Sequence, residues 1–97
     1  MTRADIVKEV SENTGLTQVE TETVLNGILQ SISHALNRGE RVDLRGFGSF
    51  LVKQRAAGVF RNPATQEKLN LQERYVPVFK ASKLMKEIVN KSMLRGF

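Results

Sequence analysis

The apolar residues of the first 40 positions recur at helical spacing. Thr2 and Asp5 form a polar cap ahead of a first apolar cluster, which predicts a helix over residues 3–13 that ends near Gly15. Thr17 and Glu20 then fit a capping box, in which each side chain accepts a hydrogen bond from the other residue's backbone. The second helix carries an apolar stripe formed by Leu25, Ile28, Leu29, Ile32 and Leu36, and it ends at Gly39. We therefore expect a helix hairpin over about residues 3–38.

From residue 41 the period becomes alternating. Val42 and Leu44 alternate with charged residues, residues 46–48 turn the chain, and Phe50 and Val52 resume the pattern. This predicts a hairpin with one apolar face. The alternation returns later, at Leu69, Leu71, Val76, Val78 and Phe79. The sheet and its projection are therefore expected over about residues 41–80.

A last apolar cluster predicts a C-terminal helix over about residues 83–91. Ser82 is its expected cap, and the cluster is made of Leu84, Met85, Ile88 and Val89. The tail at 93–97 receives no assignment. The order of elements indicates one α+β domain over residues 1–97.

Between the two alternating segments lie about 20 residues with strand-like flanks and little to bury, a length that is unusual for a structureless loop in a small domain. A projecting two-stranded arm fits this stretch better. Its centre reads VFRNPATQE, residues 59–67, where Asn62-Pro63 marks a turn. Because a two-stranded ribbon is marginal in water and a small domain buries little surface, we expect two chains to share one core in an obligate dimer.

The net charge of +5 belongs to the second part of the chain. Residues 1–39 sum to −2, whereas residues 40–97 sum to +7. This asymmetry is typical of proteins with an anionic partner such as nucleic acid or an acidic membrane surface. The sequence contains no apolar run long enough to span a membrane and no secretory signal, so no membrane association is expected. The absence of Cys fits a reducing compartment.

The residues that enzymes need are scarce. His34, the single His, lies about 180° from the apolar stripe of its helix and is expected to be a surface residue. With no Cys and one His, we expect no metal site, no cofactor and no small-molecule substrate. The Gly46-Phe47-Gly48 stretch lacks the Gly-Lys-Ser/Thr end of a phosphate-binding loop and is interpreted as a tight turn. An enzyme is therefore the least favoured class.

The cations of the arm have two interpretations. Lys53, Arg55 and Arg61 share one side at period 2 if no bulge intervenes, and Lys68 and Arg74 lie near them. One interpretation is a solvated sheet edge that charge protects from aggregation. The other is a ribbon in the minor groove of DNA with a rigid, apolar proline wedge at its tip. An arm that binds protein partners in an assembly is a third hypothesis.

Three stretches, GERVDLRGFGSF, RNPATQE and YVPVFKASKLMKEIVN, resemble the HU/IHF family of bacterial DNA-bending proteins. The likeness covers residues 2–90. It implies an intertwined dimer with an N-terminal helix hairpin, a three-stranded antiparallel sheet with a long β-ribbon arm, and a C-terminal helix. It also implies a non-enzymatic architectural protein of the cytoplasmic nucleoid that binds double-stranded DNA in the minor groove and bends it by intercalation of Pro63.

The resemblance also implies site residues. On the arm these are Arg55, Arg61, Asn62 and the intercalating Pro63, to which charge adds Lys53, Lys68 and Arg74. On the body they are Arg3, Lys80, Lys83 and Lys86 as phosphate contacts, with backbone amides from the stretch that contains Gly46, Gly48 and Ser49. Whether the dimer is a homodimer or a heterodimer with a related subunit stays open.

Within the family, the stretch from Gly39 to Phe50 and YVPVFK look more like the integration host factor β-type subunit, which acts in a site-specific heterodimer. In that subunit type an acidic residue and an arginine two positions later cooperate in sequence readout. Asp43 and Arg45 match these positions and are expected to share one strand face. A merely structural or solvated pair is the alternative.

Four residues depart from the family pattern. Gly58 stands where a basic residue is common, Phe60 where Gly is common, Gln66 where the tip turn has Gly, and Ser82 where Gly precedes Lys83. The tip turn is therefore expected to differ from the usual one. We expect Phe60 to pack against DNA sugars and so to compensate for the missing cation.

Overall fold

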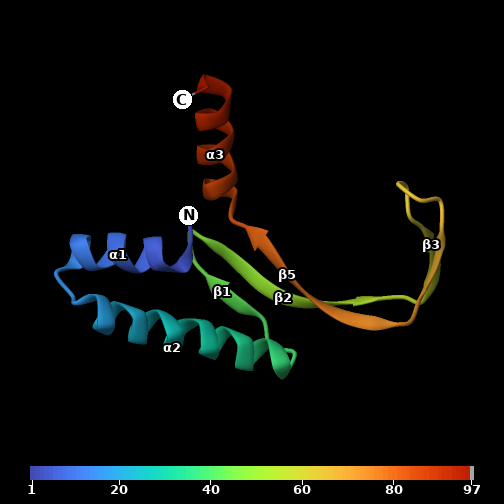
Figure 1. Ribbon diagram of the computed structural model, residues 1–97, viewed down its shortest axis with the longest axis horizontal. Coiled ribbons are helices and arrows are strands. Elements are labelled where there is room, and N and C mark those ends of the chain that lie inside the picture. The colour runs from blue at the N-terminus through green and yellow to red at the C-terminus, as the bar shows by residue number, and fades with distance from the viewer. Residues whose placement is uncertain (97) are drawn as a thin grey trace. The chain divides into compact units, whose positions relative to one another are not determined.

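The computed structural model describes residues 1–96 and has the α+β order expected from the sequence (Figure 1). Its elements are α1 (Arg3–Thr14), α2 (Gln18–Asn37), β1 (Val42–Leu44), β2 (Gly48–Arg55), β3 (Gly58–Arg61), β4 (Lys68–Leu71), β5 (Arg74–Ala81) and α3 (Lys83–Arg95). The chain forms two compact units, Met1–Ala35 and Leu36–Phe97, which are described separately below. The assignment of residues 1–97 to a single domain stays a prediction. None of the described helices is both long and apolar enough to cross a membrane.

The first unit contains the predicted helices, which begin and end through local polar contacts. The backbone N–H of Thr2 donates to Asp5 Oδ2 at 2.8 Å, and the backbone N–H of Asp5 donates to Thr2 Oγ1 at 3.3 Å, which completes a capping box on α1. Gly15 ends α1 in the left-handed conformation. The second predicted box is also present, since the backbone N–H of Glu20 donates to Thr17 Oγ1 at 3.0 Å. Both helix starts were therefore predicted correctly.

The second unit is built on an antiparallel sheet with the strand order β1-β2-β5. Val42 lies opposite Phe50, and Phe50 lies opposite Phe79, so that one face of the sheet is apolar, as predicted. The rings of Phe47 and Phe50 lie 5.3 and 4.9 Å from that of Phe79. This aromatic cluster holds the β1–β2 turn against β5.

Gly48 starts β2 close to the backbone of β5. A Cβ atom at this position would lie 2.5 Å from the carbonyl oxygen of Lys80 and 2.6 Å from the ring of Phe79. No side chain fits there without a shift of the backbone. Packing therefore requires a glycine at position 48.

The arm continues from β2 and β5 after an interruption. β2 and β5 pair as far as Arg55 and Arg74, and β3 and β4 resume pairing at Gly58 and Leu71. Two residues are skipped on each strand, so the register stays in phase across the break. The projecting arm and its turn at Asn62-Pro63 were thus predicted, whereas the interruption was not.

α3 begins at the predicted cap, where the backbone N–H of Met85 donates to Ser82 Oγ at 3.0 Å. Its predicted end at residue 91 is wrong, because the helix continues to Arg95 and ends at Gly96 in the left-handed conformation. Met93 and Leu94, which received no assignment, thus lie on an additional helical turn. Phe97 lies outside the described residues.

The described residues bury very little apolar surface. Val7 and Ala35 are buried, but two residues of the α2 stripe, Ile28 and Leu29, are 51% and 43% exposed, and α3 has no buried residue. A face of this kind is stable only when another surface covers it. This exposure agrees with the expectation of a second chain.

Two glycine substitutions are predicted to act in opposite directions. Gly48→Ala places a methyl group against backbone and an aromatic ring, and we expect it to lower the free energy of unfolding by about 1–3 kcal/mol. Gly27→Ala lies within α2 with nothing near the new atom, and we expect it to raise that free energy by about 0.5–1 kcal/mol. Urea unfolding monitored by circular dichroism measures both. Equal effects of the two changes would contradict the close approach at Gly48.

Candidate nucleic-acid interface

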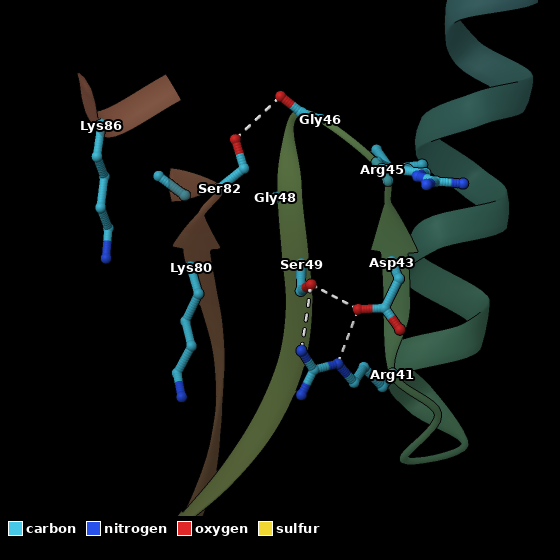
Figure 2. Close-up of a pocket in the computed structure, with 11 residues that line it drawn as sticks. Arg41, Asp43, Arg45, Gly46, Gly48, Ser49, Lys80, Ser82 and Lys86 are labelled. Atoms are coloured by element: carbon cyan, nitrogen blue, oxygen red, sulfur yellow. Dashed lines mark hydrogen bonds and ion pairs between the residues drawn. The ribbon is translucent and has the colours of Figure 1, made fainter. Parts of the chain in front are cut away.

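A shallow hollow on the second unit gathers much of the predicted body site (Figure 2). It lies where the β1–β2 turn, β5 and the first turns of α3 meet. Its lining consists of Arg41, Asp43, Leu44, Arg45, Gly46, Gly48, Ser49, Lys80, Ala81, Ser82 and Lys86. Four of these eleven side chains are cations, so the hollow suits an anionic ligand.

Asp43 is held in a small hydrogen-bonded network. Arg41 Nε donates to Asp43 Oδ1 at 2.8 Å, and Arg41 Nη2 donates to Ser49 Oγ at 3.3 Å. The hydroxyl of Ser49 donates to the same carboxylate oxygen at 2.5 Å. These bonds, that from Ser49 first and that from Arg41 second, hold the pKa of Asp43 below its ordinary value. The carboxylate is thereby offset by Arg41 and fixes the direction of its guanidinium group.

The prediction that Asp43 and Arg45 share one strand face is wrong. β1 ends at Leu44, and Gly46 has a φ of +85°, so Arg45 belongs to the turn rather than to the strand. Figure 2 shows the guanidinium of Arg45 pointing away from Asp43. The partner of Asp43 is Arg41, which the sequence analysis did not select.

Ser82 joins the turn to the helix at the upper rim of the hollow in Figure 2. Its hydroxyl donates to the carbonyl of Gly46 at 2.9 Å, and its backbone N–H donates to the carbonyl of Phe47 at 2.9 Å. This residue, a departure from the family pattern, therefore caps α3 and fixes the β1–β2 turn at once. The predicted use of backbone amides from residues 46–49 is limited, because the Phe47 N–H already donates to Leu44.

Of the predicted lysines, Lys80 and Lys86 line the hollow and extend the same way in Figure 2, whereas Lys83 is exposed on α3 outside the lining. The predicted contact at Arg3 lies on α1 in the first unit, where it borders a separate hollow. Nothing in the structure places Arg3 beside the sheet residues.

The register sorts the cations of the ribbon onto one face. Directly paired residues of neighbouring strands project to the same side, and that side alternates along each strand. By this rule Lys53, Arg55, Arg74 and Lys80 share one face of the sheet, and Arg61 and Lys68 share one face of the β3–β4 pair. Because two residues are skipped on each strand, alternation counted across the break assigns both groups to the same side of the ribbon. The prediction required that no bulge shift one strand against the other. Equal numbers of residues are skipped on the two strands, so no such shift occurs, although the pairing is interrupted.

The cationic face has a crowded point at the base of the arm. Arg55 and Arg74 are directly paired, and like charges at this spacing repel. Arg74 is half-buried, and its Nη1 atom is buried without a hydrogen-bond partner among the described residues. An anion above this pair would relieve both effects.

The tip is a compact turn around the predicted proline. Asn62 Oδ1 accepts a hydrogen bond from the Ala64 N–H at 2.9 Å, and the Asn62 carbonyl accepts one from the Gln66 N–H at 2.7 Å. Gln66 has a φ of +64°, so it adopts the left-handed conformation in which the family has Gly. The expectation that the tip turn differs from that of the family stays a prediction. Pro63 stays exposed.

Two further departures are linked in the structure. A Cβ atom at Gly58 would lie 3.3 Å from the ring of Phe60, so the ring lies along the strand over the glycine. Phe60 pairs with Leu69, and Gly58 pairs with Leu71, which places these four residues on the face opposite the cations. The absence of a side chain at position 58 makes room for the aromatic ring.

Neither the single histidine nor the acidic residues form a further site among residues 1–96. His34 is exposed on α2, as expected. Among residues 1–96 no group of three acidic, His or Cys side chains is placed to hold a metal ion. Arg41 was not predicted as a site residue, because its position depends on Ser49 of the neighbouring strand. Its place two residues before Asp43 in the alternating pattern was a usable signal.

The network around Asp43 makes a prediction that needs no ligand. Ser49→Ala removes the larger of the two hydrogen bonds that stabilise the carboxylate, so we expect the pKa of Asp43 to rise towards its ordinary value. Carbon-detected NMR titration of the carboxyl group measures this shift. Ser82→Ala, which removes a hydroxyl from the rim but not from the network, is the control and is expected to leave this pKa unchanged. An unchanged pKa in Ser49→Ala would show that the network is absent in solution.

Comparison with known proteins agrees with the fold. The family described as "Bacterial DNA-binding protein" matches residues 1–90. DNA-binding protein HU of Clostridium pasteurianum is 42% identical over 91 residues, which are 94% of this chain and 100% of that protein.

Two solved structures are similar as well. HU of Anabaena, in a cocrystal structure with DNA, is 38% identical with a TM-score of 0.82, and the match covers 92% of this chain and 97% of the Anabaena chain. HU of Thermotoga maritima is 29% identical with a TM-score of 0.67, and the match covers 92% of this chain and 98% of the Thermotoga chain. These relatives do not favour the predicted integration host factor β-type subunit. The chain therefore belongs to the bacterial DNA-binding protein family and is a non-enzymatic architectural DNA-binding protein of the HU type.

Proposed function

We propose that two copies of the chain, or one copy and a related subunit, form a dimer that bends double-stranded DNA in the nucleoid. The two arms lie along the minor groove, and Pro63 at each tip inserts between base pairs. The observation that carries this proposal is the in-phase register of the ribbon, which puts six cations on one face that leads to an exposed proline. The solved complex of Anabaena HU with DNA supports the choice of ligand.

The cationic face supplies the affinity for the groove and its phosphates. Arg61 and Lys68 form a directly paired couple beside the tip, and Arg55 and Arg74 form another at the base of the arm. Each cation that neutralises a phosphate releases counterions, which makes binding depend on salt but not on sequence. The guanidinium group of Arg74, which is half-buried, binds a phosphate through its exposed edge.

The hollow holds the flanking duplex after the bend. Arg41, Lys80 and Lys86 converge there, and α3 begins at its rim. Cations and a helix N-terminus together bind phosphate well. Asp43 acts here as a positioning residue for Arg41 and not as a reader of bases. Arg45 in the lining and the exposed Lys83 on α3 add charge to this surface. The exposed Arg3 of the first unit is proposed as a separate phosphate contact.

The tip has the properties that a wedge needs. Proline is rigid and apolar, and it has no N–H that must find a partner between base pairs. Asn62 holds the turn closed from within, so inserting the tip does not unfold it. Unstacking one base step costs a few kcal/mol, which contacts between the bent duplex and the hollow offset.

Bending is predicted to depend on Pro63 more than affinity does. A duplex of about 35 base pairs, labelled at both ends, reports bending as energy transfer. We expect wild-type protein to raise the transfer strongly, and we expect Pro63→Ala to lose most of that rise while the Kd changes by less than about tenfold, because the cations remain.

The matched control is Arg61→Ala, which removes a cation and leaves the wedge. We expect it to weaken binding on every sequence and to reduce the salt slope by about 0.9. Wild-type behaviour of both variants would exclude the arm as the DNA-binding element.

The dimer is predicted to depend on the exposed stripe of α2. Leu29→Asp puts a charge into this apolar face, and we expect the variant to sediment as a monomer and to melt at a lower temperature than the wild type. His34→Asp introduces the same charge on the opposite side of the helix and is expected to stay dimeric. Analytical ultracentrifugation distinguishes the two. A dimeric Leu29→Asp would place the interface elsewhere.

A further inference from the structure

The arm has a second face whose chemistry is unlike that of the cationic one. Phe60 and Leu69 are directly paired on it and are 49% and 46% exposed, and Leu71 continues it towards the base. The opposite face of the same ribbon carries Arg61 and Lys68. The cations thus lie on one side of the arm, which also carries Val59, whereas the other side presents an exposed apolar surface without any charge.

The apolar face depends on the glycine at position 58. The ring of Phe60 lies over Gly58, where an added Cβ atom would come within 3.3 Å of it. The missing side chain therefore lets the ring lie along the strand, on the same face as its pair partner Leu69. An aromatic side chain has few rotatable bonds, so it loses little conformational entropy when a ligand covers it.

A second copy of the arm is a poor occupant for this face. The segment from Lys53 to Arg74 carries five cations and two carboxylates, so two arms repel each other. Three side chains that are already partly covered bury roughly a few hundred Å² in total, whereas stable protein interfaces bury about 1,200 Å² or more. The apolar face alone does not hold two arms together.

DNA fits the apolar face better than a second copy does, both in charge and in the area that must be buried. Its charge is opposite to that of the arm. The cations on the other face already supply most of the affinity, so the apolar contact needs to bury little area. The sugars that line the minor groove are apolar along their edges. We propose that the face formed by Gly58, Phe60, Leu69 and Leu71 packs against the deoxyribose walls of the minor groove and gives this protein a salt-independent part of its DNA affinity.

This inference rests on the proposed placement of the arm in the minor groove. The cations then reach the phosphates at the groove rims with their long, flexible side chains, while the ring side of the ribbon faces the sugars. The inference also explains why Gly58 and Phe60 depart from the family pattern together. The glycine at position 58 removes a cation and makes room for the ring of Phe60, so that an apolar contact with DNA replaces a salt-dependent one.

The test measures the Kd for a regular duplex over a range of salt concentrations. We expect Phe60→Ala to weaken binding about tenfold at every salt concentration, with the same salt slope as the wild type. Val59→Ala is the matched control, because Val59 is apolar, adjacent and 64% exposed but lies on the cationic face. We expect it to change the Kd less than twofold. Phe60→Leu, which keeps the face apolar, is expected to retain most of the affinity.

The outcomes separate this inference from the proposed function. Amide NMR signals of Asn62 and Gln66 report whether the tip turn is intact in each variant. If Pro63→Ala and Arg61→Ala behave as proposed while Phe60→Ala matches Val59→Ala, the apolar contact is excluded and the bending function stands. A changed salt slope in Phe60→Ala, or concentration-dependent self-association that Phe60→Ala abolishes, would likewise overturn the sugar contact. If Phe60→Leu loses as much as Phe60→Ala, the face does not act through apolar packing.

Discussion

The antiparallel pairing of β2 with β5 determines where almost every functional side chain of this protein lies. Because Arg55 pairs with Arg74 and pairing resumes at Gly58 with Leu71, the same alternation governs the sheet and the arm. One face collects the cations together with some aliphatic residues, and the other carries the phenylalanines and no charge. The same pairing also places residues of the hollow, since Asp43, Ser49 and Lys80 lie opposite one another across the three strands.

The exposed apolar surface of the body is the second constraint. A chain whose α2 stripe and α3 are left uncovered is not stable alone, so a dimer is needed before the arms have a base to project from. Pairing two chains also sets two arms at a fixed separation. The proposed bending of DNA is therefore a property of the assembled dimer, so that stability and the proposed function depend on the same interface.

Local chemistry explains which parts of the fold were predictable. Both helix starts follow from caps that act within three residues, at Thr2 and Thr17. The arm was predictable from a lack of apolar residues in a segment with strand-like flanks. The end of α3 was missed although Met93 continues the four-residue spacing of Met85 and Val89, and the left-handed Gly96 ends the helix.

The site was harder to predict where it depends on contacts between strands. Arg45 was assigned to a strand because the alternation of residues continues past the point where the backbone turns at Gly46. The role of Arg41 depends on Ser49, which only the register brings near. The interruption at residues 56–57 and 72–73 has no signal in its residue types. Its equal length on both strands, which keeps the cations together, is visible only in the paired structure.

The in-phase break also restricts how the length of this arm can change during evolution. A one-residue insertion in one strand would turn the following side chains over and set cations opposite rings. One residue added to each strand would keep the pairing but exchange the two faces beyond that point. Only changes of two residues per strand leave both faces intact. We therefore expect viable arms to differ in length by steps of four residues, two on each strand, which is one complete repeat of the pleat.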